Sequence, residues 1–187
     1  MKIRPLLLLL LLPLLGMTKC EQDPAPVFTL PPATQTGANT LGFVIDGRVW
    51  QNYGKMPYSA SVSDNLRADY TTHGKSFYLY AGQTALNVRE LFSLGLDSLT
   101  SIGVYQTTNK PVPNTNPRAL RALSFSDELT HSSYGSPVKG AKGTITITKL
   151  DTIQHIVAGT FIGTLKNAND TTKLVHITDG RFDVHYQ

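Results

Sequence analysis

The only cysteine of the chain, Cys20, directly follows a stretch that has the features of an export signal. The stretch begins with the basic residues Lys2 and Arg4 and continues with a leucine-rich apolar run over residues 6–15. A basic start followed by a short apolar run is typical of a secretory signal peptide. A membrane-spanning helix needs about 20 apolar residues, roughly twice the length of this run. We therefore predict a signal peptide over residues 1–19.

The thiol of Cys20 has one chemistry that fits its position, which is acylation as the lipid-attachment residue of a bacterial lipoprotein. Residues 16–19 would form the recognition segment, although Lys19 departs from the small residue that is usual there. Several acyl chains on one residue anchor a protein stably. The alternative is cleavage by the ordinary signal peptidase near residues 18–21, which leaves a free thiol, because a lone cysteine forms no internal disulfide. We expect lipidation of Cys20 and anchoring in the outer membrane, on its periplasmic or its surface face.

Aromatic side chains indicate where a ligand could bind. In a strand over residues 77–80, Tyr78 and Tyr80 would share one face. Trp50 lies in a neighbouring predicted element. Exposed together, such rings can stack on sugars or hold an apolar ligand, so Trp50, Tyr78 and Tyr80 are the candidate binding residues. The alternative is that these rings fill the core of a β-sandwich, since aromatic residues favour strands.

A metal site is conceivable near the C-terminus, but the sequence does not favour one. The predicted last hairpin would place His176 opposite Asp183, with His185 on the same face, and such side chains can ligate zinc. A solvated polar pair across two strands is the alternative. Because no histidine or cysteine spacing typical of a metal site is present, we predict no metal and no cofactor.

The chain carries no motif of an enzyme active site. It has no Gly-x-Ser-x-Gly sequence and no glycine-rich phosphate-binding loop. We therefore predict a protein that is not an enzyme. A catalytic triad assembled in space would leave no such motif, so a small hydrolase on a β-scaffold is the alternative.

The charge of the chain belongs mostly to the predicted signal peptide. Of 187 residues, 17 are Lys or Arg and 13 are Asp or Glu, which gives a net charge of +4. Residues 1–19 hold three of the bases and none of the acids, so residues 20–187 carry 14 bases and 13 acids, a net charge of +1. A near-neutral chain of this length fits one domain and does not favour nucleic acid as a partner.

The elements that would position these residues are short strands separated by turn residues. Residues 143–149 alternate strictly, with Ile145 and Ile147 on one face. Residues 58–62, 67–72, 75–81, 88–96, 101–106, 121–126 and 155–165 also read as strands, and the best helix candidate is residues 116–123. About ten strands with frequent turns predict an all-β, antiparallel β-sandwich, with a partly open barrel as the alternative.

Two Asp-Gly pairs predict β-hairpins, because both turn positions must adopt positive φ. Asp46-Gly47 would pair Val44 with Val49 and Phe43 with Trp50. Asp179-Gly180 would join residues 173–178 to residues 181–186 in a last hairpin.

The segment before the strands reads as a tether. Residues 21–40 hold four of the eleven prolines, which favour extended chain. We therefore divide the chain into the signal peptide (1–19), a lipid-anchored proline-rich tether (20–40) and a single β-domain (41–187).

Several stretches together resemble a family of Bacteroidetes envelope lipoproteins that is catalogued as a domain of unknown function. The middle of the chain, residues 53–135, resembles it only loosely. The matching stretches are residues 30–40, 42–45, 46–50, 143–151, 158–161 and 177–183. The resemblance implies a lipidated all-β domain in the cell envelope and brings no catalytic residue. We expect a non-enzymatic lipoprotein that binds a ligand, such as a carbohydrate, or an envelope protein. A purely structural envelope component is a further alternative.

Overall fold

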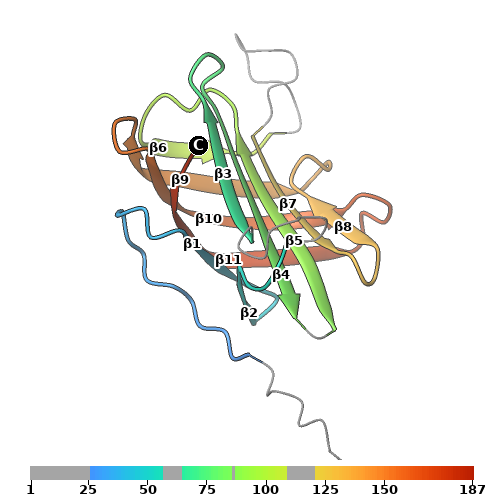
Figure 1. Ribbon diagram of the computed structural model, residues 1–187. Helices are drawn as coiled ribbons and strands as arrows, with labels where there is room; N and C mark the ends of the chain where they lie inside the picture. Colours follow the sequence, from blue (N-terminus) through green and yellow to red (C-terminus); the bar gives the residue numbers. More distant parts are fainter. Residues whose placement is uncertain (1–25, 57–64, 86, 109–120) are drawn as a thin grey trace, which may run out of the picture.

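Every regular element is a β-strand in a computed structural model that describes residues 26–56, 65–85, 87–108 and 121–187 (Figure 1). This confirms the all-β class, with eleven strands where about ten were expected. The strands are β1 (Thr40–Ile45), β2 (Arg48–Gln51), β3 (Leu66–Thr71), β4 (Ser76–Ala85), β5 (Val88–Leu96), β6 (Gly103–Gln106), β7 (Arg121–Asp127), β8 (Ser132–Gly135), β9 (Lys142–Asp151), β10 (Ile156–Asn167) and β11 (Leu174–His185).

The strands form one open antiparallel sheet that folds over into two layers, as expected for a β-sandwich-like fold (Figure 1). The order along the sheet is β2-β1-β11-β10-β8-β7-β5-β4-β3, while β9 pairs with β10 and β6 with β9. The sheet divides at β10, which pairs with β9 over residues 156–164 and with β8 at Lys166 and Asn167. One layer therefore holds β3, β4, β5, β7 and β8, and the other holds the remaining strands.

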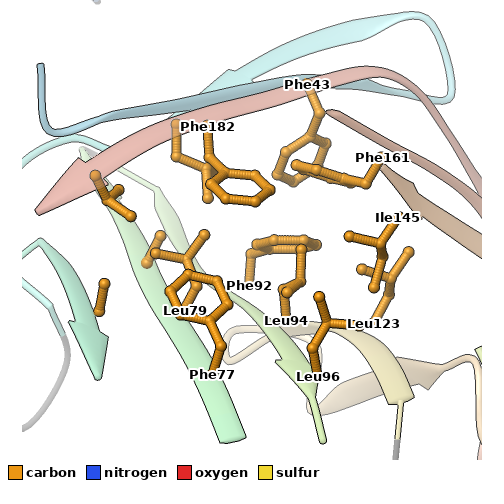
Figure 2. Close-up of a cluster of buried hydrophobic side chains, with 14 of the residues drawn as sticks. Phe43, Phe77, Leu79, Phe92, Leu94, Leu96, Leu123, Ile145, Phe161 and Phe182 are labelled. Carbon is orange, nitrogen blue, oxygen red and sulfur yellow. The ribbon is translucent and has the colours of Figure 1, made fainter. Parts of the chain in front are cut away.

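Alternating side chains from both layers fill the space between them (Figure 2). The ring of Phe92 lies 4.8 Å from that of Phe43 and 4.9 Å from that of Phe161, measured between centroids. Phe92 comes from one layer and the two others come from the opposite layer, so these rings bridge the sandwich. As predicted, Ile145 and Ile147 point into the core.

The first predicted hairpin is confirmed in its register and its turn. Phe43 pairs with Trp50 and Val44 with Val49. Asp46 and Gly47 adopt φ angles of 47° and 83°, which are the positive values that a two-residue turn of this type requires.

The last predicted hairpin is wrong, because β11 runs unbroken through Asp179 and Gly180. Gly180 pairs with Phe161 and Ile177 pairs with Gly163, so two residues of β11 lie opposite one residue of β10. β11 also pairs with β1 along its other edge. With partner strands on both sides the Asp-Gly pair is accommodated as a β-bulge, in which Asp179 takes a φ of 53°.

Replacing Gly180 by alanine is expected to destabilise the domain by about 1–3 kcal/mol, the usual cost of forcing an extra carbon into a filled space. A Cβ at this position would lie 2.5 Å from the carbonyl oxygen of Phe161 and 2.6 Å from its ring. Urea unfolding monitored by circular dichroism measures the change. The control is Gly74→Ala in the β3–β4 turn, where the nearest atom is a serine hydroxyl at 3.2 Å. Equal stability of the two variants would contradict the packing at the bulge.

Some predictions fall outside the described residues. These are the signal peptide, Cys20, the strand over residues 58–62 and most of the helix candidate over residues 116–123, of which residues 121–123 begin β7 instead. Within the described part of the chain, no helix combines the length and the apolar character needed to cross a bilayer.

Part of the predicted tether lies against the domain. We call residues 28–39 the N-terminal strap. The ring of Phe28 meets that of Tyr53 edge-on at 5.4 Å, and Pro31 is buried over Gly42 of β1, where a Cβ would come within 2.5 Å of the proline ring. The strap therefore lies over β1 on the outer face of its layer.

Candidate functional site

Trp50 belongs to the core and is therefore not a binding residue. Its side chain is fully buried and stacks on Phe43 at 4.7 Å between centroids. The expectation that it shares a binding surface with the two tyrosines is wrong, because β2 turns this side chain between the layers. The alternative interpretation of an aromatic core residue holds for Trp50.

Tyr78 and Tyr80 share the outer face of β4, as the alternation predicts. The neighbouring inward residues Phe77 and Leu79 are fully buried, whereas Tyr80 is 43% exposed. Tyr78 is half-buried, and its hydroxyl donates a hydrogen bond of 3.1 Å to the Asp97 carboxylate. Burial, together with this hydrogen bond and the charge of Asp97, raises the pKa of Tyr78, so its phenol stays protonated at neutral pH.

The outer face beside Tyr80 is formed by small hydroxyl-bearing residues. Tyr80 pairs with Ser93 of β5, which pairs in turn with Ser124 of β7. In the next row of the sheet, Ser126 of β7 pairs with Ser133 of β8. Four serines from three strands therefore lie on the same side of the layer as Tyr80.

A pocket of about 290 Å³ opens on this face. Leu91 and Met56 add apolar surface to it. The full lining is Met56, Tyr80, Ala81, Leu91, Phe92, Ser93, Ser124, Phe125, Ser126 and Ser133. None of these side chains carries a charge, so the pocket offers hydroxyl groups, one exposed aromatic ring and apolar contacts.

Sequence reasoning missed the serines of this pocket. Alternation within the strands could have placed them on the outer face. Ser93 alternates with buried leucines and phenylalanines in β5, and Ser124 and Ser126 do so in β7. The pairing of β5 with β7 was the missing information. These two strands are separated in the sequence by β6 and by residues 109–120, so no short turn indicates their register.

The residues of the conceivable metal site are not brought together. His176 and Asp183 lie on one strand instead of facing each other across a hairpin. The Nδ1 atom of His176 is 3.2 Å from the hydroxyl of Thr164, while His185 packs beside Gly37 of the strap. Among the described residues no group of three or more side chains could hold a metal ion.

Asp183 serves instead as the attachment point of the strap. Its carboxylate is almost fully buried and accepts hydrogen bonds from the Thr34 hydroxyl at 2.7 Å and from the backbone N–H groups of Thr36, Gly37 and Ala38 at 2.8–3.2 Å. Burial alone would raise the pKa of Asp183, but these donors outweigh it and lower the pKa below its usual value. The carboxylate is therefore ionised at neutral pH and fully hydrogen-bonded.

A second hollow, of about 240 Å³, lies where the β1–β2 turn meets the β7–β8 turn. Its wall contains an ion pair in which one Arg48 nitrogen donates to both oxygens of Glu90, at 2.7 and 3.0 Å. A second Arg48 nitrogen donates to the buried side chain of Gln83 at 3.2 Å. These contacts join β2 to β4 and β5. The charged groups in this hollow therefore pair with each other, and the ion pair links the two layers.

The hydrolase alternative requires histidine, aspartate and serine in one cleft. The five histidines lie in three different turns and at two positions of β11. They are His73, His131, His155, His176 and His185. His155, in the β9–β10 turn, stacks on Tyr186 at 5.1 Å. Neither pocket described above is lined by a histidine.

No protein-family model, no curated protein and no solved structure matches this chain.

Proposed function

We propose that this protein is a non-enzymatic lipoprotein of the cell envelope, anchored to the outer membrane through Cys20, and that its β-domain binds a neutral saccharide beside Tyr80. The anchoring half rests on the sequence of residues 1–20. The binding half rests on one observation, which is an uncharged pocket lined by four serines next to an exposed tyrosine.

Each group in the pocket matches a part of a sugar. The hydroxyls of Ser93, Ser124 and Ser126 can donate and accept hydrogen bonds, as sugar hydroxyls also do. The ring of Tyr80 offers an apolar face to the C–H groups of a pyranose, and its phenol offers a polar edge. A charged ligand would find no counter-charge in this lining, which favours a neutral one.

Replacing Tyr80 by alanine is expected to weaken saccharide binding about tenfold, which corresponds to about 1.4 kcal/mol. The stacking face is lost while the serines remain. Isothermal titration calorimetry with neutral mono- and oligosaccharides of glucose and of N-acetylglucosamine measures the change.

The matched control is Tyr53→Ala, because Tyr53 is 44% exposed against 43% for Tyr80 and does not line the pocket. This variant should bind as the wild type does. If Tyr80→Ala binds the same saccharides unchanged, or if no saccharide binds the wild type, the proposal is wrong.

Replacing Cys20 by alanine is expected to abolish the incorporation of labelled palmitate into the protein expressed in a bacterial host. The thiol is the only group of its kind in the chain, so no second residue can substitute for it. In membrane fractionation of the same cells, the wild type should be found in the membrane fraction and Cys20→Ala in the soluble fraction. Palmitate labelling that persists in Cys20→Ala would refute the lipid anchor.

A further inference from the structure

Tyr78 is held across the outer face of the sheet at two points. Its backbone belongs to β4, and its hydroxyl reaches Asp97, just beyond the end of β5, at 3.1 Å. Between these points the ring passes over Gly95, the residue directly paired with Tyr78, where a Cβ would come within 3.3 Å of two ring carbons. A larger residue at position 95 would lift the ring away from the sheet.

The network behind Tyr78 fixes its partner as well. Asp97 is 5% exposed, and the same carboxylate oxygen accepts a hydrogen bond of 2.6 Å from the hydroxyl of Ser76. The acceptor is therefore ordered independently of Tyr78. A ring placed in this way loses little conformational freedom when a ligand binds on it, which favours affinity.

Tyr78 lies one row of the sheet away from the pocket. The Tyr80 row continues to Ser93 and Ser124, and the Tyr78 row continues to Gly95 and Ala122. Two residues of a strand span roughly 6.8 Å, so the two tyrosines are close enough to contact adjacent units of one saccharide chain. Gly95 has no side chain and that of Ala122 is a single methyl group, so no long side chain of β5 or β7 projects from the Tyr78 row on this face.

We propose that Tyr78 forms a second sugar subsite and that the ligand is an unbranched neutral oligosaccharide of at least two units, which extends from the Tyr80 pocket across the Tyr78 row. The inference rests on the proposed function and specifies its ligand. In this arrangement Tyr80 and the serines bind the first unit, Tyr78 binds the second, and Asp97 is a positioning residue that acts through Tyr78.

The test is the dependence of affinity on chain length. The probes are glucose and unbranched glucose oligomers of two to four units in α-1,4 and β-1,4 linkage, with the N-acetylglucosamine series alongside, titrated against the full domain with its strap. For the wild type, affinity should rise about tenfold from one unit to two. Tyr78→Ala should bind one unit as the wild type does and lose this rise. Tyr78→Phe keeps the ring but lacks the hydroxyl that Asp97 holds, and should lose part of the rise, about two- to fivefold.

The outcomes separate this inference from the proposed function. If one unit binds as tightly as four and Tyr80→Ala still weakens binding, the second subsite is refuted and the proposed function stands. If Tyr78→Ala shows the wild-type dependence on length, the second subsite is also refuted. If no probe binds, both fail. Far-ultraviolet circular dichroism of each variant verifies folding, and Tyr78→Phe provides the answer if Tyr78→Ala does not fold.

Discussion

Replacing Asp183 by asparagine is expected to lower the free energy of unfolding by about 2–4 kcal/mol at neutral pH. The buried carboxylate accepts hydrogen bonds from several donors, and a hydrogen bond to a charged group contributes about 1.5–3 kcal/mol. The contributions of bonds that share one acceptor do not simply add. Asparagine has almost the same shape as aspartate, but only one of its two polar atoms accepts. The amide nitrogen would then face either the N–H of Gly37 or the donors of Thr34, Thr36 and Ala38. Urea unfolding measures the loss, and proteolysis within residues 28–39 should become faster as the strap is released.

The control for this experiment is Asp179→Asn on the same strand. It removes the same charge from an exposed side chain, and asparagine accepts the positive φ of this position as readily as aspartate does. Its stability should stay within about 0.5 kcal/mol of the wild type, as for most surface substitutions. If the two variants are equally stable, the hydrogen bonds to Asp183 do not hold the strap.

Because the carboxylate of Asp183 titrates and asparagine does not, the destabilisation caused by Asp183→Asn depends on pH. Because the pKa of Asp183 is lower in the folded protein than in the unfolded chain, its contribution is complete above the unfolded value of 3.8 and is lost as the pH falls through the folded value. The stability difference between the wild type and Asp183→Asn should therefore be constant near neutral pH and shrink below about pH 4. A difference that grows on acidification would contradict the assignment.

Replacing Phe92 by alanine is expected to destabilise the domain by about 3–5 kcal/mol, the usual cost of deleting a buried aromatic ring. The side chain is 1% exposed and packs against both Phe43 and Phe161 of the opposite layer (Figure 2). Its removal opens a cavity where the two layers meet, and rings fixed by their own strands cannot move to fill it. Thermal and urea unfolding measure the loss.

Tyr80→Ala is the matched control for this deletion. It also removes an aromatic ring, from the neighbouring strand β4, but on the outer face of the same layer. Its unfolding should stay close to that of the wild type while its saccharide binding falls. An unfolding midpoint for Phe92→Ala equal to that of Tyr80→Ala would mean that the two layers do not pack through this ring.

The two Asp-Gly pairs show how far local sequence determines this fold. Both favour positive φ, and both Asp46 and Asp179 adopt it. Only the first pair turns the chain, because β2 follows as a terminal strand of the sheet, whereas residues after Asp179 continue between β1 and β10. The all-β class, the alternation within strands and the positive φ of both aspartates were therefore predictable, while the choice between a hairpin and a bulge depended on strands distant in the sequence.

The candidate site was predictable to a similar extent. Alternation placed Tyr78 and Tyr80 correctly on one face of β4, because that property is local to a strand. It could not exclude Trp50 or identify the serines, because both depend on which strands pair and which face the opposite layer covers. The strap was missed for the same reason, since proline-rich chain reads as extended whether or not a distant carboxylate such as Asp183 binds it.

The strap also determines how a mechanical load would enter the domain. A pull on the chain before residue 28 first meets the apolar contacts of Phe28 and Pro31. It then meets the hydrogen bonds to Asp183, in a strand hydrogen-bonded along both edges to β1 and β10. Without that attachment the pull would act at Thr40 and peel away the β1–β2 end of the sheet one residue at a time. If the chain is anchored at residue 20 as proposed, the hydrogen bonds to Asp183 direct force into the interior of the sheet and away from its terminal β1–β2 pair.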